Sequence, residues 1–267
     1  MVTTIAISGK GGSGKTSLAA MMIRTLLEQA DKNAVLAVDA DPNACLGLTL
    51  GVQVVGTVAD IREQARAKPS AGIDRLRSVE YGIQQAITEA EGFDLLTMGR
   101  PEGPACYCAA NNMLRKFLDE LSSQYRFVVI DNEAGMEHLS RRTTNNVDLL
   151  CIVAEPTSLG VVTARRIFEL ARQLPIAVRQ IGVIWNKVAE GNNSEPIRKE
   201  ESNAKRCTLN AVDTFGHIPF DKALSDASMQ GKTVFELASD SPAFLATREI
   251  LEHVLLLSSS QTINNEL

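Results

Sequence analysis

Residues 9 to 16 have the residue types and spacing best suited to chemistry in this sequence. They are Gly-Lys-Gly-Gly-Ser-Gly-Lys-Thr and fit the phosphate-binding pattern G-x-x-x-x-G-K-[ST]. Glycines let successive backbone N–H groups turn toward a phosphate, and a helix that begins at Lys15 adds its positive N-terminal dipole. Lys15 is expected to reach the β- and γ-phosphates of a nucleotide, and the Thr16 hydroxyl to bind Mg²⁺. The alternative is a tight strand-to-helix turn without a ligand.

The nucleotide-binding residues predicted in this segment are Gly9, Lys10, Gly11, Gly12, Ser13, Gly14, Lys15, Thr16 and Ser17.

Cys106 and Cys108 form a second chemical feature, a Cys-x-Cys pair. Two thiols one residue apart can chelate a soft metal, and in an intracellular chain they indicate metal binding or redox activity. A Zn²⁺ site needs about four ligands, so one pair is not enough, whereas two pairs in a dimer would supply four thiolates. Two incidental cysteines are the alternative. We expect the other three to be small core residues: Cys45, Cys151 and Cys207.

The elements that must position these residues follow from short apolar runs that alternate with helical patterns. This alternation predicts an α/β fold, a mostly parallel sheet flanked by helices on both faces, with ligands at the carboxyl ends of the strands. Helices are expected near residues 15–30, 109–123, 158–173, 220–230 and 243–257. The predicted strands are Thr4–Ser8, Ala34–Asp39, Phe93–Met98, Phe127–Asp131, Leu149–Ala154, Val178–Trp185 and Val212–Ile218.

The whole chain, residues 1–267, is expected to form a single domain. The polar segment Glu190–Lys205 indicates a surface loop running into a helix, and the polar tail from about residue 258 is expected to fray. Hydrophobic residues make up 45% of the chain and aromatic residues only 4%, which predicts an aliphatic core of the kind found in parallel sheets.

The charge balance, the hydropathy and the N-terminal sequence argue against several classes of protein, although a local basic patch stays open. There are 27 basic and 32 acidic residues, a net charge of −5, which argues against broad nucleic-acid binding. No apolar run reaches the length of about 18 residues that a membrane helix needs. The N-terminus, MVTTIAISGKGG, lacks the pattern of a secretory signal. We therefore expect a cytoplasmic protein that binds neither nucleic acid nor membrane.

Lys10 is a second lysine inside the phosphate loop. It cannot easily serve the same phosphate as Lys15, but it can cross a dimer interface to the partner's nucleotide. The resulting form, Lys-Gly-Gly-x-Gly-Lys-Thr, resembles the deviant Walker A type of P-loop NTPase. That superfamily includes MinD and ParA proteins, the nitrogenase iron protein and metal-cluster maturation ATPases. Its members are nucleotide-dependent dimers, so the resemblance implies a homodimeric ATPase with ATP as its nucleotide.

The resemblance also implies roles for carboxylates that follow two of the strands. Asp41 resembles the acidic residue of the family's first switch, which positions Mg²⁺ or the attacking water. Asp39 lies closer to the strand, and for it a role in the site and a purely structural role as a cap of the turn both stay open. Asp131 can hold Mg²⁺ through water, and Gly135 can offer an N–H to the γ-phosphate, as in the second switch; Glu133 between them is less certain. The expected catalytic residues are Lys10, Lys15, Asp41 and Asp131.

Base recognition is expected in two later segments. Asn186 and Lys187 follow a strand and resemble the purine-recognising asparagine segment of the family, since an amide can pair with both a donor and an acceptor on a base edge. Ile218 and Pro219 belong to a later segment that resembles the loop packing on the base, although an ordinary structural role is the alternative there.

A closer resemblance comes from three features together: the phosphate loop, the Cys-x-Cys pair between the two switches, and the segment from Asp131 to His138. This combination is similar to the CooC-type ATPases, which assist nickel insertion into carbon monoxide dehydrogenase, with a close relative serving acetyl-CoA synthase. It implies a metallochaperone that uses ATP and Mg²⁺ and binds Ni²⁺ or Zn²⁺ through Cys106 and Cys108 at the dimer interface. Its partner would be one of these nickel enzymes.

Two other functions stay open. A positioning ATPase like MinD ends in a basic amphipathic helix, whereas residues 258–267 contain no Lys or Arg, and a ParA-like protein needs a basic surface. An electron-donating iron–sulfur ATPase shares one cluster through two widely separated cysteines per chain. Here the cysteines are adjacent, although four thiolates could hold a cluster.

Overall fold

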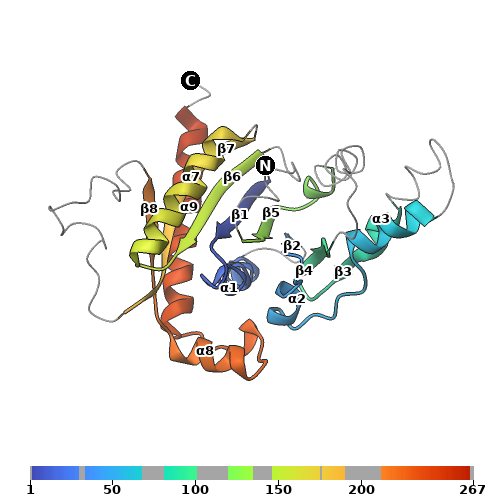
Figure 1. The fold of residues 1–267 in the computed structure, drawn as a ribbon, viewed down its shortest axis with the longest axis horizontal. Helices are drawn as coiled ribbons and strands as arrows, with labels where there is room; N and C mark the ends of the chain where they lie inside the picture. The colour runs from blue at the N-terminus through green and yellow to red at the C-terminus, as the bar shows by residue number, and fades with distance from the viewer. Residues whose placement is uncertain are drawn as a thin grey trace.

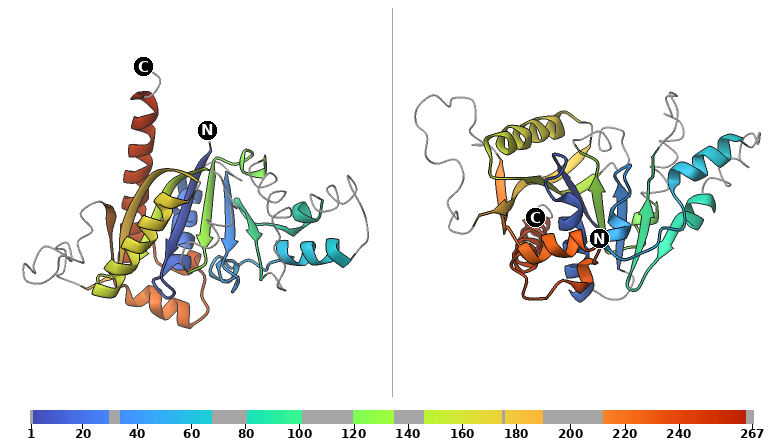
Figure 2. Two further views of the ribbon diagram at one scale, coloured as in Figure 1. Left: turned by 45° about the horizontal axis from the view of Figure 1, so that its top comes forward. Right: turned by 60° about the horizontal axis from the view of Figure 1, so that its bottom comes forward.

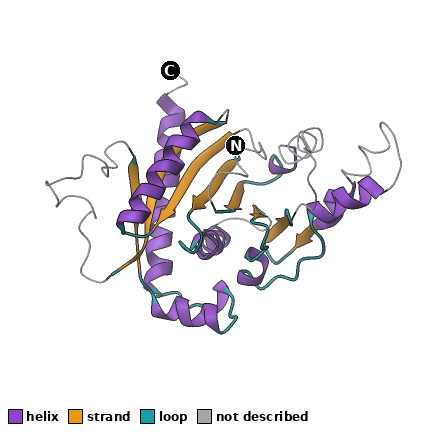
Figure 3. Cartoon of the chain, viewed as in Figure 1, coloured by secondary structure: helices purple, strands orange, loops and turns teal. Residues whose placement is uncertain are grey.

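The computed structural model describes residues 2–29, 34–67, 81–100, 120–134, 146–174, 176–189 and 212–264. Its strands are β1 (Thr3–Gly9), β2 (Val35–Ala40), β3 (Ile87–Glu89), β4 (Phe93–Thr97), β5 (Phe127–Asn132), β6 (Asn146–Ala154), β7 (Ala177–Val188) and β8 (Asp213–Pro219). They form one sheet in the order β3-β4-β2-β5-β1-β6-β7-β8. Neighbouring strands are parallel except β3 with β4. Figure 3 shows this sheet between helices.

The carboxyl ends of the parallel strands meet at one edge of the sheet. β1 lies at the centre, where Ile7 is level with Asp131 of β5 on one side and Cys151 of β6 on the other. Asp131 is in turn level with Asp39 of β2. This register brings the segments that follow β1, β2, β5 and β6 to the same edge, where parallel sheets bind their ligands.

Helices cover both faces of the sheet (Figure 1). They are α1 (Lys15–Gln29), α2 (Leu46–Thr49), α3 (Val58–Ala67), α7 (Ser158–Gln173), α8 (Lys222–Met229), the 3₁₀ turn η1 (Val234–Glu236) and α9 (Pro242–Asn264). The right-hand view in Figure 2 separates α7 on one side of the sheet from α1 and α9 on the other. None of the helices in the described ranges is both long and apolar enough to cross a membrane.

Two hydrophobic cores follow from the alternation of side chains along each strand. Ile5 and Ile7 of β1 point to the face covered by α1 and α9, while Ala6 points to the face covered by α7. All three side chains are fully buried. A sheet that is buried on both faces explains why its strands are continuous apolar runs instead of alternating ones.

Arg24 fastens α1 to the C-terminal part of the chain. Its guanidinium donates to the carbonyl oxygens of Val234 (2.9 Å) and Leu237 (2.7 Å), and it lies 4.0 Å from the ring centre of Phe244. Because the charged group is buried, these carbonyls and the aromatic face replace the water that it has lost. These contacts hold α1, the helix that follows the phosphate loop, against the segment from η1 to the start of α9.

The fold class and all seven predicted strands are confirmed, with ends that differ by a few residues. The prediction missed β3, α2, α3 and η1, and also the helical residues 81–86. α9 continues to Asn264, beyond the predicted end near residue 257, since the polar sequence there contains neither Pro nor Gly to stop a helix. The described residues include only the end, 120–123, of the helix predicted over 109–123.

Of the three cysteines expected in the core, Cys151 is buried but Cys45 is exposed, which corrects that expectation. Cys45 immediately precedes the four-residue helix α2. Cys207 lies outside the described residues, as does the predicted surface loop over 190–205.

Candidate functional site

The phosphate loop joins β1 to α1 at the carboxyl edge of the sheet, as predicted. Gly12 and Gly14 adopt positive φ angles of 79° and 93°, which residues with a Cβ rarely adopt. Gly9 has a different constraint, because a Cβ there would lie 2.4 Å from the carbonyl oxygen of Val153. Backbone conformation therefore requires glycine at positions 12 and 14, and close packing requires it at position 9. The helix α1 begins directly after this loop, at Lys15.

Lys15 and Thr16 occupy the first turn of α1. The Lys15 side chain is buried at 7% exposure, and its Nζ donates across the loop to the carbonyl oxygen of Lys10 at 3.4 Å. The Thr16 hydroxyl donates to Oδ2 of Asp131 at 2.6 Å, although 115 positions separate the two residues in the sequence. The structure thus brings together three of the residues that the sequence predicted for phosphate and Mg²⁺.

Asp131 has the properties of a ligand for a hard cation. Its side chain is 1% exposed, and Oδ1 has no hydrogen-bond partner in the described part of the chain. Burial raises its pKa to about 6, against the lowering effects of the Thr16 hydrogen bond and the Lys15 charge, while the charge of Asp41 raises it further. A buried carboxylate with a free oxygen beside a threonine hydroxyl fits the oxygen ligands and bound waters that Mg²⁺ prefers.

Asp39 and Asp41, at the end of β2, have different surroundings. Asp39 is fully buried, and its two oxygens accept backbone N–H groups from Asp41 (3.2 Å) and Leu46 (2.9 Å). Burial raises its pKa to about 7, and the backbone hydrogen bonds oppose that rise. Asp41 is half-buried, and its Oδ1 accepts from the backbone and side-chain nitrogens of Asn43 at 2.9 Å. Asp39 therefore shapes the loop that carries Asp41.

Asn186 and Lys187 lie against the phosphate loop from the end of β7. The Asn186 Nδ2 donates to the carbonyl oxygen of Ser13 at 2.8 Å, and its approach is possible because Gly14 has no side chain: a Cβ there would lie 2.3 Å from this nitrogen. The Lys187 Nζ donates to the carbonyl oxygen of Gly12 at 2.8 Å and to Oε1 of Glu155 at 2.7 Å. The predicted base-binding segment is thus next to the phosphate loop.

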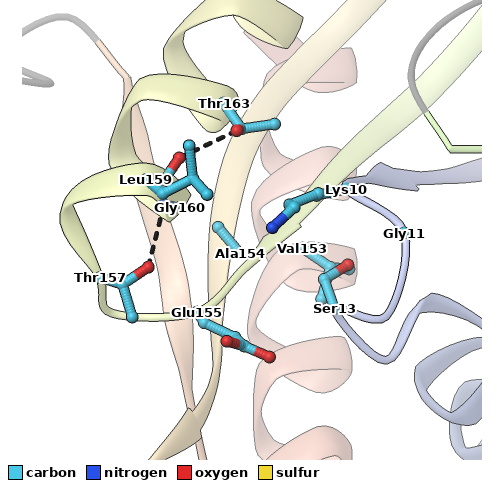
Figure 4. A pocket seen from close by; sticks show the side chains of 10 residues that line it. All are labelled: Lys10, Gly11, Ser13, Val153, Ala154, Glu155, Thr157, Leu159, Gly160 and Thr163. Atoms are coloured by element: carbon cyan, nitrogen blue, oxygen red, sulfur yellow. Dashed lines mark hydrogen bonds between the residues drawn. The ribbon is translucent and has the colours of Figure 1, made fainter.

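The phosphate loop also borders an open hollow, which Glu155 helps to line (Figure 4). The exposed Lys10 lines it, and in Figure 4 its ammonium group points toward β6. The N-terminus of α7 forms the opposite wall, where the Thr157 side chain accepts from the backbone N–H of Gly160 at 3.0 Å. The lining residues are Lys10, Gly11, Ser13, Val153, Ala154, Glu155, Thr157, Leu159, Gly160 and Thr163.

For the remaining predicted residues, Ile218, Pro219 and Gly135, the evidence concerns burial, backbone pairing or a neighbouring residue. The Ile218 side chain is 1% exposed and belongs to the core beneath α1 and α9, so only its backbone is available to a base. Pro219 pairs with Val188 at the end of β8. Gly135 lies outside the described residues, but Ala134 just before it is close to the loop, since a Cβ on Gly11 would be 3.8 Å from the Cβ of Ala134.

Cys106 and Cys108 also lie outside the described residues. Within the described ranges, no group of three or more His, Cys, Asp or Glu side chains is arranged to hold a metal ion.

The prediction from sequence missed Glu155. A signal was present, because Glu155 follows directly after β6 as Asp41 follows β2, and a polar residue just past the carboxyl end of a parallel strand is a candidate for the site. Asn132 was also missed; its Nδ2 donates to the carbonyl oxygen of Ile7 at 2.9 Å and so links the ends of β5 and β1.

Comparison with known proteins agrees with this geometry. The family model "CobQ/CobB/MinD/ParA nucleotide binding domain" matches residues 4–234. An uncharacterised ATP-binding protein of Methanocaldococcus jannaschii is 40% identical over 258 residues, covering 94% of this chain and 98% of the relative. The carbon monoxide dehydrogenase accessory protein CooC of Rhodospirillum rubrum is 33% identical over 248 residues, covering 88% of this chain and 90% of that protein.

Among solved structures, a chain of the MinC:MinD cell division protein complex of Aquifex aeolicus aligns with a TM-score of 0.70 and 20% identity, covering 95% of this chain and 96% of that one. At this identity the likeness concerns the fold, and it confirms the parallel sheet with helices on both faces. The family match covers most of the chain and includes the phosphate loop. The chain belongs to the CobQ/CobB/MinD/ParA nucleotide-binding family and is a P-loop ATPase.

Proposed function

We propose that this chain is a homodimeric, ATP-hydrolysing metallochaperone that assists nickel insertion into carbon monoxide dehydrogenase or acetyl-CoA synthase. The observation that carries the proposal is the similarity to the CooC accessory protein over 88% of this chain. The Cys-x-Cys pair supports it from the sequence, because soft thiolate ligands suit Ni²⁺ or Zn²⁺. Nickel is here the cargo, and ATP hydrolysis is the step that controls its release.

Lys15, Thr16 and Asp131 would hold the nucleotide phosphates and their Mg²⁺. The buried Lys15 ammonium and the N-terminus of α1 neutralise phosphate charge, and the Thr16 hydroxyl and a water on Asp131 would bind the ion. When bound, Mg²⁺ would supply positive charge that offsets the negative charge of the phosphates. Asp131 keeps one oxygen without a protein partner in the described residues, which leaves it available for this role.

Asp41 and Lys10 are the remaining catalytic candidates. Asp41 would orient the attacking water, because it lies at the end of β2 and close enough to Asp131 to raise that residue's pKa. Lys10 is exposed at the edge of the site and would reach the partner's nucleotide, so hydrolysis would require a dimer. Gly135 would offer its N–H to the γ-phosphate, Asn186 and Lys187 would face the base, and Ile218 and Pro219 would contact it through their backbone.

The Cys106 and Cys108 pairs of two subunits would together give one four-thiolate site. Thiolates must lose protons to bind, so metal affinity should fall as the pH is lowered. ATP and metal would both favour the same dimer, and two such ligands strengthen each other, typically by about 1–3 kcal/mol. Hydrolysis would then weaken the dimer and free the metal for its client.

The test is an anaerobic titration of the purified protein with Ni²⁺ or Zn²⁺, followed by light scattering with and without ATP. We expect one metal ion per two chains, metal-induced dimerisation, and loss of both in the variant Cys106→Ser/Cys108→Ser. Cys45→Ser is the matched control, because it removes an exposed thiol outside the pair and should leave metal binding unchanged. One metal per monomer, or undiminished binding in the double variant, would contradict the metal site but not the ATPase.

The same titration separates the alternative functions. A positioning ATPase like MinD or ParA would dimerise with ATP alone, and added metal would neither bind nor change its dimerisation. An iron–sulfur electron donor would give a brown protein with a cluster spectrum, whereas a nickel or zinc protein lacks that spectrum.

A further inference from the structure

Three side chains hold the outer side of the phosphate loop, and no catalytic role explains all of them. Asn186 and Lys187 are consecutive residues near the end of β7, and they donate to two consecutive loop carbonyls, those of Ser13 and Gly12, at 2.8 Å each. Glu155, directly after β6, accepts from the same Lys187 ammonium at 2.7 Å. The loop is thus braced from two neighbouring strands.

The backbone of Lys187 is unusual. Its φ is +58°, and in the described part of the chain only one other non-glycine residue, Ala44, has a positive φ. A residue with a Cβ adopts this left-handed conformation at a cost in free energy, and such outliers persist where surrounding contacts impose them, often at functional sites. Here the Lys187 N–H donates to Oδ1 of Asn186 at 2.9 Å, which also sets the orientation of the amide that holds Ser13.

An ordinary surface ion pair does not account for this arrangement. The Lys187 and Glu155 side chains are 43% and 39% exposed, and exposed pairs contribute little to stability. Such a pair would not be expected to maintain a strained backbone. The same ammonium group, however, also binds a carbonyl of the phosphate loop, and that contact has a geometric consequence.

The consequence follows from the planar trans peptide, in which C=O and N–H point in opposite directions. The carbonyl of Ser13 belongs to the same peptide unit as the N–H of Gly14, and the carbonyl of Gly12 to that of Ser13. Because Asn186 and Lys187 bind these carbonyls, the two N–H groups point away from Asn186 and Lys187, and the Ser13 N–H donates across the loop to the carbonyl oxygen of Lys10 at 3.2 Å. Inward N–H groups are what a phosphate requires from such a loop.

We propose that Lys187 and Glu155 are positioning residues that, together with Asn186, hold the phosphate loop in its phosphate-binding shape before the nucleotide arrives. The inference rests on the nucleotide site proposed above and adds to it a direct mechanical link between the base-binding and phosphate-binding segments. Glu155 acts through Lys187, and Lys187 acts through the carbonyl of Gly12.

The test uses Lys187→Gly in the full chain, with two ligands measured by calorimetry in the presence of Mg²⁺: ATP, and inorganic tripolyphosphate, which has no base. Glycine removes the ammonium and also accepts the positive φ, so thermal stability should not fall. Affinity for both ligands should fall by a similar factor, roughly tenfold, the effect of one charge-assisted hydrogen bond. Lys187→Arg keeps a charged donor and should bind both ligands more tightly than Lys187→Gly.

Glu155→Gln is the second variant, and it keeps the inference testable if the glycine variant does not fold. This variant should also lower the affinity for both ATP and tripolyphosphate, but by a smaller factor of about threefold. Its matched control is Glu169→Gln on α7, which removes one charge of an exposed pair with Arg165 at 2.9 Å and should change nothing.

Unchanged affinity for both ligands in Lys187→Gly and Glu155→Gln would overturn the inference. So would a loss confined to ATP, because Lys187 would then act on the base alone. Wild-type protein that bound neither ligand would instead contradict the nucleotide site itself.

Discussion

The ends of β2 and β5 lie side by side, and each carries a buried aspartate at the same level of the sheet, Asp39 beside Asp131. Exposure is 0% for Asp39 and 1% for Asp131, and burial raises the pKa of the first to about 7 and of the second to about 6. Their oxygens nevertheless have different partners. Both oxygens of Asp39 accept backbone N–H groups, whereas Asp131 accepts one hydroxyl and keeps Oδ1 unpaired among the described residues.

This difference shows that burial and residue type do not by themselves assign a role to an acidic side chain. Both oxygens of Asp39 accept hydrogen bonds within its own loop, from the backbone N–H groups of Asp41 and Leu46, and these bonds hold the turn between the two residues. Asp131 has an oxygen to spare, and the Thr16 hydroxyl lies next to it. The end of β2 therefore mainly builds the loop, whereas the end of β5 keeps a carboxylate oxygen unpaired among the described residues, as the proposed Mg²⁺ site requires.

Replacement of Asp131 should have the largest effect on activity. In Asp131→Asn the neutral amide holds a hydrated Mg²⁺ poorly, so we expect Mg²⁺-dependent ATP hydrolysis to fall by about 10²–10³-fold, the loss typical of one electrostatic group. Stability without Mg²⁺ should be unchanged or higher, because the variant no longer buries an incompletely paired carboxylate. Phosphate release measures hydrolysis, and urea unfolding measures stability. Hydrolysis at the wild-type rate in this variant would show that Asp131 has no role in the site.

Replacement of Asp39 should mainly lower stability, whereas replacement of Asp131 should mainly lower ATP hydrolysis. Asp39→Ala leaves one buried and one partly buried backbone N–H group without an acceptor, so we expect the free energy of unfolding to fall by about 2–4 kcal/mol. Asp39→Asn keeps one acceptor oxygen and should lie between the alanine variant and the wild type. Urea unfolding of the three proteins without nucleotide provides the measurement. If Asp39→Ala is as stable as wild type but inactive, the assigned roles of the two aspartates must be revised.

Asp221 extends the comparison to an aspartate in the segment that follows β8. It caps α8 by accepting from Ala223 and Leu224, and its other oxygen accepts the Ser241 hydroxyl at 2.5 Å. Burial acts to raise its pKa, but the hydrogen bonds from Ser241 and from three backbone N–H groups outweigh burial and lower the pKa below 3.8.

Because this folded-state pKa is depressed, the stabilisation from Asp221 is present above the unfolded value of 3.8 and is lost as the pH falls through the folded value. At neutral pH we expect Asp221→Ala to cost about 1–2 kcal/mol, the usual loss for a helix cap. The difference from wild type should stay constant down to about pH 5 and shrink below about pH 4. Urea unfolding at several pH values tests this, and a difference that grows on acidification would contradict the sign.

The sequence by itself determined the fold class, and it predicted which residues would meet at the phosphate loop. Apolar strand-length runs and the contiguous motif from Gly9 to Thr16 are local patterns, and a parallel sheet brings strand ends to one edge whatever the details of packing. For that reason Lys15, Thr16 and Asp131 could be assigned together. Short elements such as β3 and α2 escaped prediction, because three or four residues do not establish a period.

Only the tertiary structure decided which polar groups are paired. The contact of Asn186 with Ser13 spans 173 positions, and Glu155 meets Lys187 because β6 and β7 are neighbours in a particular register. The same holds for Asp39 and Asp131, whose roles differ only through the partners of their oxygens. Hydrogen bonds act over about 3 Å, so their partners depend on strand order, register and loop conformation, which no short stretch of sequence contains.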